Sequence, residues 1–268
     1  MPAENSIPEQ EQETLASPSL EEAVHSDSPD VLKAAAADPA LNEDLALALL
    51  KHNDLAPEVL EQLGKNGSAM KYRKVKLALV EHPRTPRYIS LPMVRSLFTF
   101  DLMRVALMPI APSDVKMAAD EALINRLKTI SSGERLSLAR RASGRIAGEL
   151  LLDPEPRVIR VALENFRLIE ASILKTISRH DAPAAFVEAV CHHAKWSVRR
   201  EIRMALLRNE KTPLARALEF SRTLPPPLVK EILHVSRLPA SVKAYLEKDL
   251  EERMGQRGKT VRRIKKNV

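Results

Sequence analysis

The sequence predicts an all-α protein, an α-solenoid built from about five to six helical hairpins. Three observations lead to this fold class. Glycine is scarce, with 7 residues in 268, and aromatic residues make up only 3% of the chain. Alanine, leucine, lysine, arginine and glutamate, which favour helices, are abundant, and no segment shows the alternating pattern of a half-buried strand. Finally, one short helical pattern returns at a nearly constant interval along the chain.

The returning pattern is apolar, basic, apolar, alanine, and its best copy begins at Val115. There Val115, Ala118, Ala119 and Ala122 follow helical spacing and form one apolar stripe, with Lys116 at its edge. The other copies begin at Leu32, Val75, Ile159, Ile202 and Val242, so the successive spacings are 43, 40, 44, 43 and 40 residues. Such a period is typical of repeat proteins, and we interpret each period as one pair of helices.

Apolar runs separated by proline predict the helices themselves. Thr85-Pro86 and Thr212-Pro213 each pair an expected N-cap hydroxyl with a proline at the first helical position, where a missing N–H has no cost. In chain order, helices are expected at 31–37, 42–51, 57–63, 69–80, 86–97, 102–107, 113–129, 135–141, 144–152, 158–166, 169–177, 184–193, 197–208, 214–222, 228–235 and 241–253.

Charge divides the chain into three parts. Residues 1–28 are rich in acidic and polar residues, contain no lysine or arginine, and are expected to be disordered. Within them, 19–22 resembles a capping box that has little apolar surface to dock. Residues 29–252 form the expected solenoid. Residues 253–268 form a basic tail with seven lysine and arginine residues and no acid.

Targeting signals are missing from the sequence as given. The single cysteine, Cys191, excludes an internal disulfide, and no apolar run approaches the length of a membrane span. The first residues include glutamates and lack the basic segment of a signal peptide. We therefore expect a cytoplasmic location without membrane association.

Segment 113–123, which begins with Ser113-Asp114-Val115-Lys116, resembles the second helix of a HEAT-type repeat. Segments 75–86 and 202–213 are similar to the leucine-rich-repeat variant, a related helical repeat. Together the resemblance covers about residues 29–252. It implies a solenoid with a concave binding face. Founding members of the variant-repeat family also carry an iron–sulfur cluster held by cysteines, which Cys191 alone cannot bind, so no cofactor is predicted.

The second position of each repeated segment carries a cation, and we call these six residues the basic ladder. In HEAT-type repeats the corresponding cation commonly bonds carboxylates and carbonyls of adjacent turns, and it also flanks the concave face. We favour the structural role over ligand binding because a charge at the edge of a stripe usually extends to solvent. The ladder consists of Lys33, Lys76, Lys116, Arg160, Arg203 and Lys243.

The only tryptophan, Trp196, lies among cations that include Arg199 and Arg200. A second group of cations comprises Arg140, Arg141 and Arg145. Arginines around an aromatic ring can neutralise phosphates while the ring stacks on a base. The alternative, which we favour, is that Trp196 packs between helices while the arginines face water, because a series of stacking residues is lacking.

Metal binding and catalysis find little support in the sequence. His180, Cys191, His192 and His193 are the only candidate ligands close together, but adjacent histidines on a helix point about 100° apart. We favour a core role for Cys191 and a helix-end role for the histidines. Phosphate-binding loops, nucleophile elbows and zincin motifs are missing, so we expect no metal site and no enzyme activity.

The function that the sequence favours is a non-enzymatic scaffold or adaptor that binds a macromolecule, in the first place a protein, on its concave face. The alternative is nucleic-acid binding, because all the net positive charge lies outside the acidic first segment. That alternative includes similarity to HEAT-like alkylpurine DNA glycosylases, which bind DNA along a basic concave face. The binding candidates are the basic ladder together with Trp196, Arg199 and Arg200.

Overall fold

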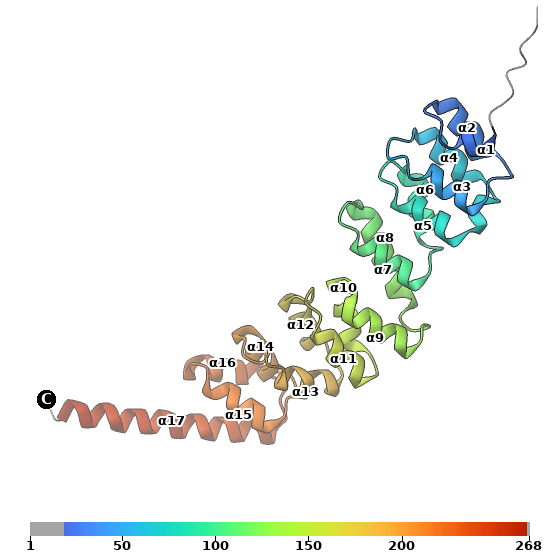
Figure 1. Cartoon of the computed structure of the whole chain (residues 1–268). Helices are drawn as coiled ribbons and strands as arrows, with labels where there is room; N and C mark the ends of the chain where they lie inside the picture. The colour runs from blue at the N-terminus through green and yellow to red at the C-terminus, as the bar shows by residue number, and fades with distance from the viewer. Residues whose placement is uncertain (1–18, 267–268) are drawn as a thin grey trace, which may run out of the picture. The chain divides into compact units, whose positions relative to one another are not determined.

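The computed structural model describes the backbone of residues 19–266 and the side chains of residues 19–255 (Figure 1). Every regular element within residues 19–266 is a helix, which confirms the predicted all-α class. None of these helices combines the length and the apolar character that a bilayer crossing requires. The chain divides into two compact units that meet between Leu97 and Phe98, and each unit is described separately.

The first unit packs its helices around leucine and valine side chains. Leu49, Leu60, Leu63 and Val75 are fully buried in one continuous apolar cluster. Helix α2 packs on α4 and α3 packs on α5, so these helices contact their second neighbours along the chain, whereas α6 packs on its immediate neighbour α5. The elements are α1 (Leu20–Ala23), α2 (Pro29–Ala37), α3 (Glu43–Leu49), α4 (Pro57–Lys65), the short 3₁₀ helix η1 (Ala69–Lys71), α5 (Arg73–Glu81) and α6 (Arg87–Val94).

In the second unit second-neighbour packing extends over more helices, although α7 packs on its immediate neighbour α8. One series runs α8, α10, α12, α14 and α16, each packed on the next, and a second runs α9, α11 and α13, with α15 packed on α17. The elements are α7 (Thr99–Leu107), α8 (Ser113–Arg126), α9 (Ser132–Arg141), α10 (Gly144–Glu149), η2 (Leu150–Leu152), α11 (Pro156–Leu163), α12 (Glu170–Ile177), α13 (Ala184–His192), α14 (Arg200–Arg208), α15 (Leu214–Arg222), α16 (Pro226–Val235) and α17 (Ala240–Lys266).

Buried polar side chains connect second-neighbour helices, and we call them tether residues. Each follows the end of a helix and donates a hydrogen bond to a carbonyl at the end of the helix two before it. Asn165, after α11, binds the carbonyls of Ala139 and Ala142 at the end of α9, at 2.9 and 3.2 Å. The last carbonyls of a helix have no partner within it, so the tethers satisfy them. The others are His52, Asn66, His82, Trp196 and Asn209.

In the tether residues His82 and Asn209, the second polar atom of the side chain accepts a backbone N–H two residues later in the chain. The Nδ1 atom of His82 accepts the amide N–H of Arg84 at 3.2 Å, so its Nε2–H is free to donate to the carbonyl of His52 at 2.9 Å. Asn209 matches it, because its Oδ1 accepts the amide N–H of Lys211 while its Nδ2 binds the carbonyl of Ile177. One side chain therefore fixes the turn that follows its own helix. It also packs this turn against the end of the helix two before it.

The interpretation of the repeat period as one pair of helices was wrong. The basic ladder lies on α2, α5, α8, α11, α14 and α17, so one period covers three helices. Most of these helices have only eight or nine residues, which leaves room for three within forty-odd residues. Because packing follows second neighbours, Lys116 and Arg203 lie in the series that begins with α8, whereas Arg160 lies in the series that begins with α9. The ladder residues of this unit therefore do not follow one line.

The ends of the helical region differ from the prediction. Residues 1–18 lie outside the described part of the chain, but 19–28 contain helix α1, whose capping box is formed by Ser19 and Glu22. Ala23 and Val24 are buried in the apolar cluster of the first unit. This burial gives α1 a docking surface larger than the sequence led us to expect. At the other end, α17 continues through the predicted boundary at 252 to Lys266. Residues 267–268 are not described.

The two Thr-Pro pairs take a different role from the predicted N-caps. Pro86 and Pro213 are themselves the N-cap residues of α6 and α15. The buried hydroxyl of Thr85 instead donates to the carbonyl of Leu79 at 2.6 Å, and Thr212 binds Leu206 in the same way. The threonines therefore close the end of the preceding helix.

Candidate functional site

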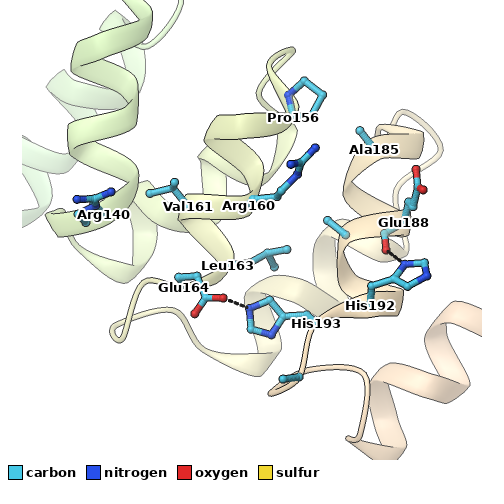
Figure 2. A pocket seen from close by; sticks show the side chains of 12 residues that line it. Arg140, Pro156, Arg160, Val161, Leu163, Glu164, Ala185, Glu188, His192 and His193 are labelled. Carbon is cyan, nitrogen blue, oxygen red and sulfur yellow. Dashed lines mark hydrogen bonds and ion pairs between the residues drawn. The ribbon is translucent and has the colours of Figure 1, made fainter.

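The second unit contains a groove between α11 and α13, with a volume of about 690 Å³ (Figure 2). Its floor is apolar and includes Val161 and Leu163 from α11. Helix α13 contributes Ala185 and Ala189, one turn apart on the same side. These small side chains leave the space open between two helices that pack on each other.

Charged side chains of both signs surround this floor. Arg140, near the end of α9, and Arg160, on α11, stand on one side, and Glu188 stands on α13 (Figure 2). Among the described side chains, no carboxylate lies within ion-pair distance of Arg140 or Arg160. The groove therefore presents two cations without a carboxylate partner together with two carboxylates, Glu164 at the end of α11 and Glu188 on α13.

Two adjacent histidines occupy the end of the groove and point in different directions (Figure 2). His193 accepts the amide N–H of Lys195 at Nδ1, and its Nε2 lies 3.1 Å from Oε1 of Glu164. His192 uses Nδ1 to donate to the carbonyl of Glu188, one turn earlier, at 2.9 Å. The Nδ1 atom of His193 is thus engaged within the protein, whereas its buried Nε2 lies close to Glu164 without forming a hydrogen bond. No cluster of three possible metal ligands exists among the side chains described.

Cys191 lies beneath this surface with no exposed area. Burial raises the pKa of its thiol to about 12, because the thiolate would lose its solvation there. Since the thiolate is the reactive form, the buried thiol is inert at neutral pH. His180, the remaining candidate ligand, lies elsewhere and accepts a hydrogen bond from Arg237.

We expect a thiol reagent such as dithionitrobenzoate to leave Cys191 unmodified in the native protein at pH 8. After unfolding in urea the same reagent should release one equivalent, since this is the chain's only cysteine. A Lys175→Cys variant is the matched control, because Lys175 is exposed and its replacement should react at once. Rapid modification of the native wild-type thiol would contradict the burial of Cys191.

Three members of the basic ladder bind carbonyls of the turn before their own helix. Lys116 Nζ donates to Pro109 at 3.0 Å, Arg203 Nε to Ser197 at 2.7 Å and Lys243 Nζ to Ser236 at 2.6 Å. Each cation closes a local turn six or seven residues upstream. For these three residues the geometry favours the structural role, although the bond stays within one turn and does not cross to the next repeat.

The other ladder residues are placed separately. Lys33 is exposed on α2. Lys76 lines a second groove, of about 460 Å³, in the first unit, where Met70, Ile89 and Met93 supply apolar surface. Arg160 is the only ladder residue that lines the groove between α11 and α13. The structure therefore does not bring the basic ladder together into one site.

Trp196 is a tether residue, so its indole is not available to stack on a base. It is 2% exposed, and its Nε1 donates to the carbonyl of Leu163 at 2.9 Å. Lys195 covers one side, with Nζ 4.2 Å from the centre of the ring. Arg199 forms an ion pair with Glu170 at 3.0 Å, and Arg200 is exposed in the first turn of α14. The packing interpretation of Trp196 is confirmed.

The sequence analysis missed the groove residues Glu164, Ala185, Glu188 and Ala189. Alanines one turn apart on α13 were visible, but nothing in the sequence specified which helix they would face.

Comparisons with protein families, with curated proteins and with solved structures gave no match to this chain.

Proposed function

We propose that this chain is a non-enzymatic helical-repeat scaffold that binds a protein partner through a peptide segment lying in the groove between α11 and α13. The observation that carries the proposal is the combination of an apolar floor with a rim of both charge signs. Arg140 and Arg160 face Glu188 across the groove. Protein ligands carry aliphatic side chains and charges of both signs, whereas a polyanion would be repelled by the carboxylates.

The arrangement also supports directional binding. Aliphatic side chains of a peptide would occupy the space above Ala185 and Ala189, its acidic side chains would pair with Arg140 and Arg160, and its basic side chains would pair with Glu188. Arg140 and Arg160 are available for bidentate pairing because neither binds a carboxylate within the described structure. The inert thiol of Cys191 and the hydrogen-bonded Nδ1 of His193 favour binding over catalysis.

Our proposal for the architecture is an α-solenoid of the HEAT or leucine-rich-repeat-variant type. Its support is the second-neighbour packing in each unit, with tether residues joining the ends of successive helices. In such an array every packed pair contacts only its neighbours, and grooves between pairs form a row of docking surfaces. Trp196 was the aromatic residue that could have stacked on a base in the DNA-glycosylase alternative. Its burial therefore argues against that alternative.

A photoreactive cross-linking amino acid at Ala185 tests the function, with Lys175, at the far end of α12, as the control position. After nuclease treatment of a native extract, we expect a defined protein adduct from position 185 and none from position 175. The cross-linked segment, once identified by mass spectrometry and synthesised, should bind the purified full chain.

The Arg160→Glu variant should weaken binding of that synthetic segment at least about tenfold, the effect of losing one charge-assisted pair and adding a repulsion. Thermal unfolding checks that this variant remains folded, as expected for an exposed side chain. Identical adducts from positions 185 and 175, or unchanged affinity in Arg160→Glu, would reject the groove as the binding site.

A further inference from the structure

Every second connection from α9 to α14 lies at one edge of the second unit, and we call these three the loop edge: residues 142–143, 164–169 and 193–199, with the adjoining helix turns. Arg167 Nη1 donates to the carbonyl of Arg141 at 3.2 Å and joins the first two connections. Trp196 Nε1 binds the carbonyl of Leu163, and Arg199 pairs with Glu170, which joins the second to the third. Here α9, α11 and α13 end and α10, α12 and α14 begin.

Large apolar side chains are exposed along this edge. Phe166 is 72% exposed, Ile169 60% and Val198 61%. Single exposed apolar residues are ordinary, but three on adjoining connections form a surface that suits a ligand with flat apolar groups. The guanidinium of Arg167 lies 4.1 Å from the centre of the Phe166 ring. One side of the ring is therefore covered by a cation.

The edge is also strongly cationic. Residues 139–145, 163–170 and 193–201 contain seven lysine and arginine residues and three glutamates. Two of those glutamates, Glu164 and Glu170, already pair with His193 and Arg199. Arg145 pairs with Glu121. Within the described side chains no carboxylate pairs with the remaining five cations, which are Arg140, Arg141, Arg167, Lys195 and Arg200.

We propose that the loop edge binds single-stranded nucleic acid, with a base stacked on Phe166 and phosphates held by the unpaired cations. Every base has a flat apolar face, and stacking on an aromatic side chain needs a base that is not already stacked within a duplex. An acidic peptide would use the cations, but only its aromatic residues would offer the exposed ring a flat group, whereas every nucleotide carries both a flat base and a phosphate. The proposed stacking site lies outside the groove, because Phe166, Arg141 and Arg200 do not line it, whereas Arg140 belongs to both surfaces.

The probe is fluorescein-labelled oligo(dT) or oligo(U) of about 15 nucleotides, titrated with the full chain at low salt and followed by fluorescence anisotropy. Phe166→Ala should weaken binding at least about fivefold, the lower limit for loss of one base stack. The double variant Arg141→Ala/Arg200→Ala should also reduce the slope of log affinity against log salt by roughly 1.4, because two phosphate contacts are lost.

The matched control is Lys175→Ala/Arg208→Ala, which removes the same charge from the opposite ends of α12 and α14. It should bind like the wild-type chain, and the basic residues 253–268 are identical in all variants. Circular dichroism and thermal unfolding establish that each variant is folded.

Three results would overturn the proposal. The first is no binding of either oligonucleotide by the wild-type chain at low salt. The second is an equal loss of oligonucleotide affinity in the two double variants, which would assign binding to net charge, or an unchanged affinity in both, which would assign binding to another segment. The third is binding to anionic lipid vesicles, but not to oligonucleotides, that depends on Phe166.

Discussion

Arg135→Ala is expected to destabilise the protein by about 3–5 kcal/mol, the cost of removing one partner from a buried ion pair. Arg135 Nε lies 2.8 Å from Oδ2 of Asp153, and its Nη2 lies 2.6 Å from Oε1 of Glu155. Its Nη1 donates to the carbonyl of Ile130 at 3.1 Å. The Asp153 side chain is 2% exposed, so the variant would leave its carboxylate buried without its cation.

This network holds α9 against the start of α11, because Asp153 and Glu155 immediately precede α11. Urea denaturation followed by circular dichroism measures the loss. The control is Arg145→Ala, whose partner Glu121 and whose own side chain are both about half exposed, so we expect a loss below about 1 kcal/mol. Equal losses in the two variants would mean that the Arg135 network does not contribute through burial.

Asn165→Ala is expected to have the second largest effect, a loss of about 2–4 kcal/mol in the free energy of unfolding. Asn165 is 2% exposed and donates to two carbonyls of α9, while its Oδ1 accepts the amide N–H of Arg167 at 2.8 Å. Alanine leaves both buried carbonyls and the part-buried N–H of Arg167 without this partner. The cost of such unsatisfied groups exceeds the net gain from forming one hydrogen bond.

Phe166→Ala is the neighbouring control, because the exposed ring contributes little to the core and its removal should cost less than about 0.5 kcal/mol. The same denaturation experiment compares the two variants. A loss below about 0.5 kcal/mol for Asn165→Ala would contradict the role assigned to the tether residues.

The fold class followed from the sequence because composition and periodicity act locally. Scarce glycine and aromatics, with apolar residues at helical spacing, dictate helices whatever their neighbours are. The repeat was harder to interpret, because a pattern of four residues marks an amphipathic helix without saying how many helices separate two copies. The copies at Val75 and Ile202 are both genuine helices, α5 and α14, yet each is separated from its nearest marked neighbours by two unmarked helices.

The tether residues show why the true packing relation was hidden. The side chain after a helix is histidine at 82, asparagine at 165 and 209, and tryptophan at 196, so one structural role is filled by three residue types. The role is recognisable only in part. Segments 75–86 and 202–213 align His82 with Asn209, and they align the two buried threonines, Thr85 and Thr212.

The candidate site could be predicted only in fragments. Arg160 appeared in the basic ladder, and Trp196 was expected to pack between helices, as it does. The groove itself depends on Ala185 and Ala189 facing α11, a relation between segments more than twenty residues apart. Exposure of Phe166 likewise depends on the neighbouring loops, since its sequence context does not distinguish it from a core residue.

The distance between α10 and α16 tests the central claim, that helices stack on second neighbours in an open array, most directly. Spin labels at Arg145→Cys and Lys230→Cys can be introduced selectively, because the native Cys191 is buried. Three packing steps separate these helices, through α12 and α14, and each step is 8–10 Å between axes. The account predicts that pulsed electron–electron double resonance will measure a distance of about 25–30 Å between the two spin labels. A single narrow distance below about 15 Å, as expected for a closed helical bundle, would contradict it.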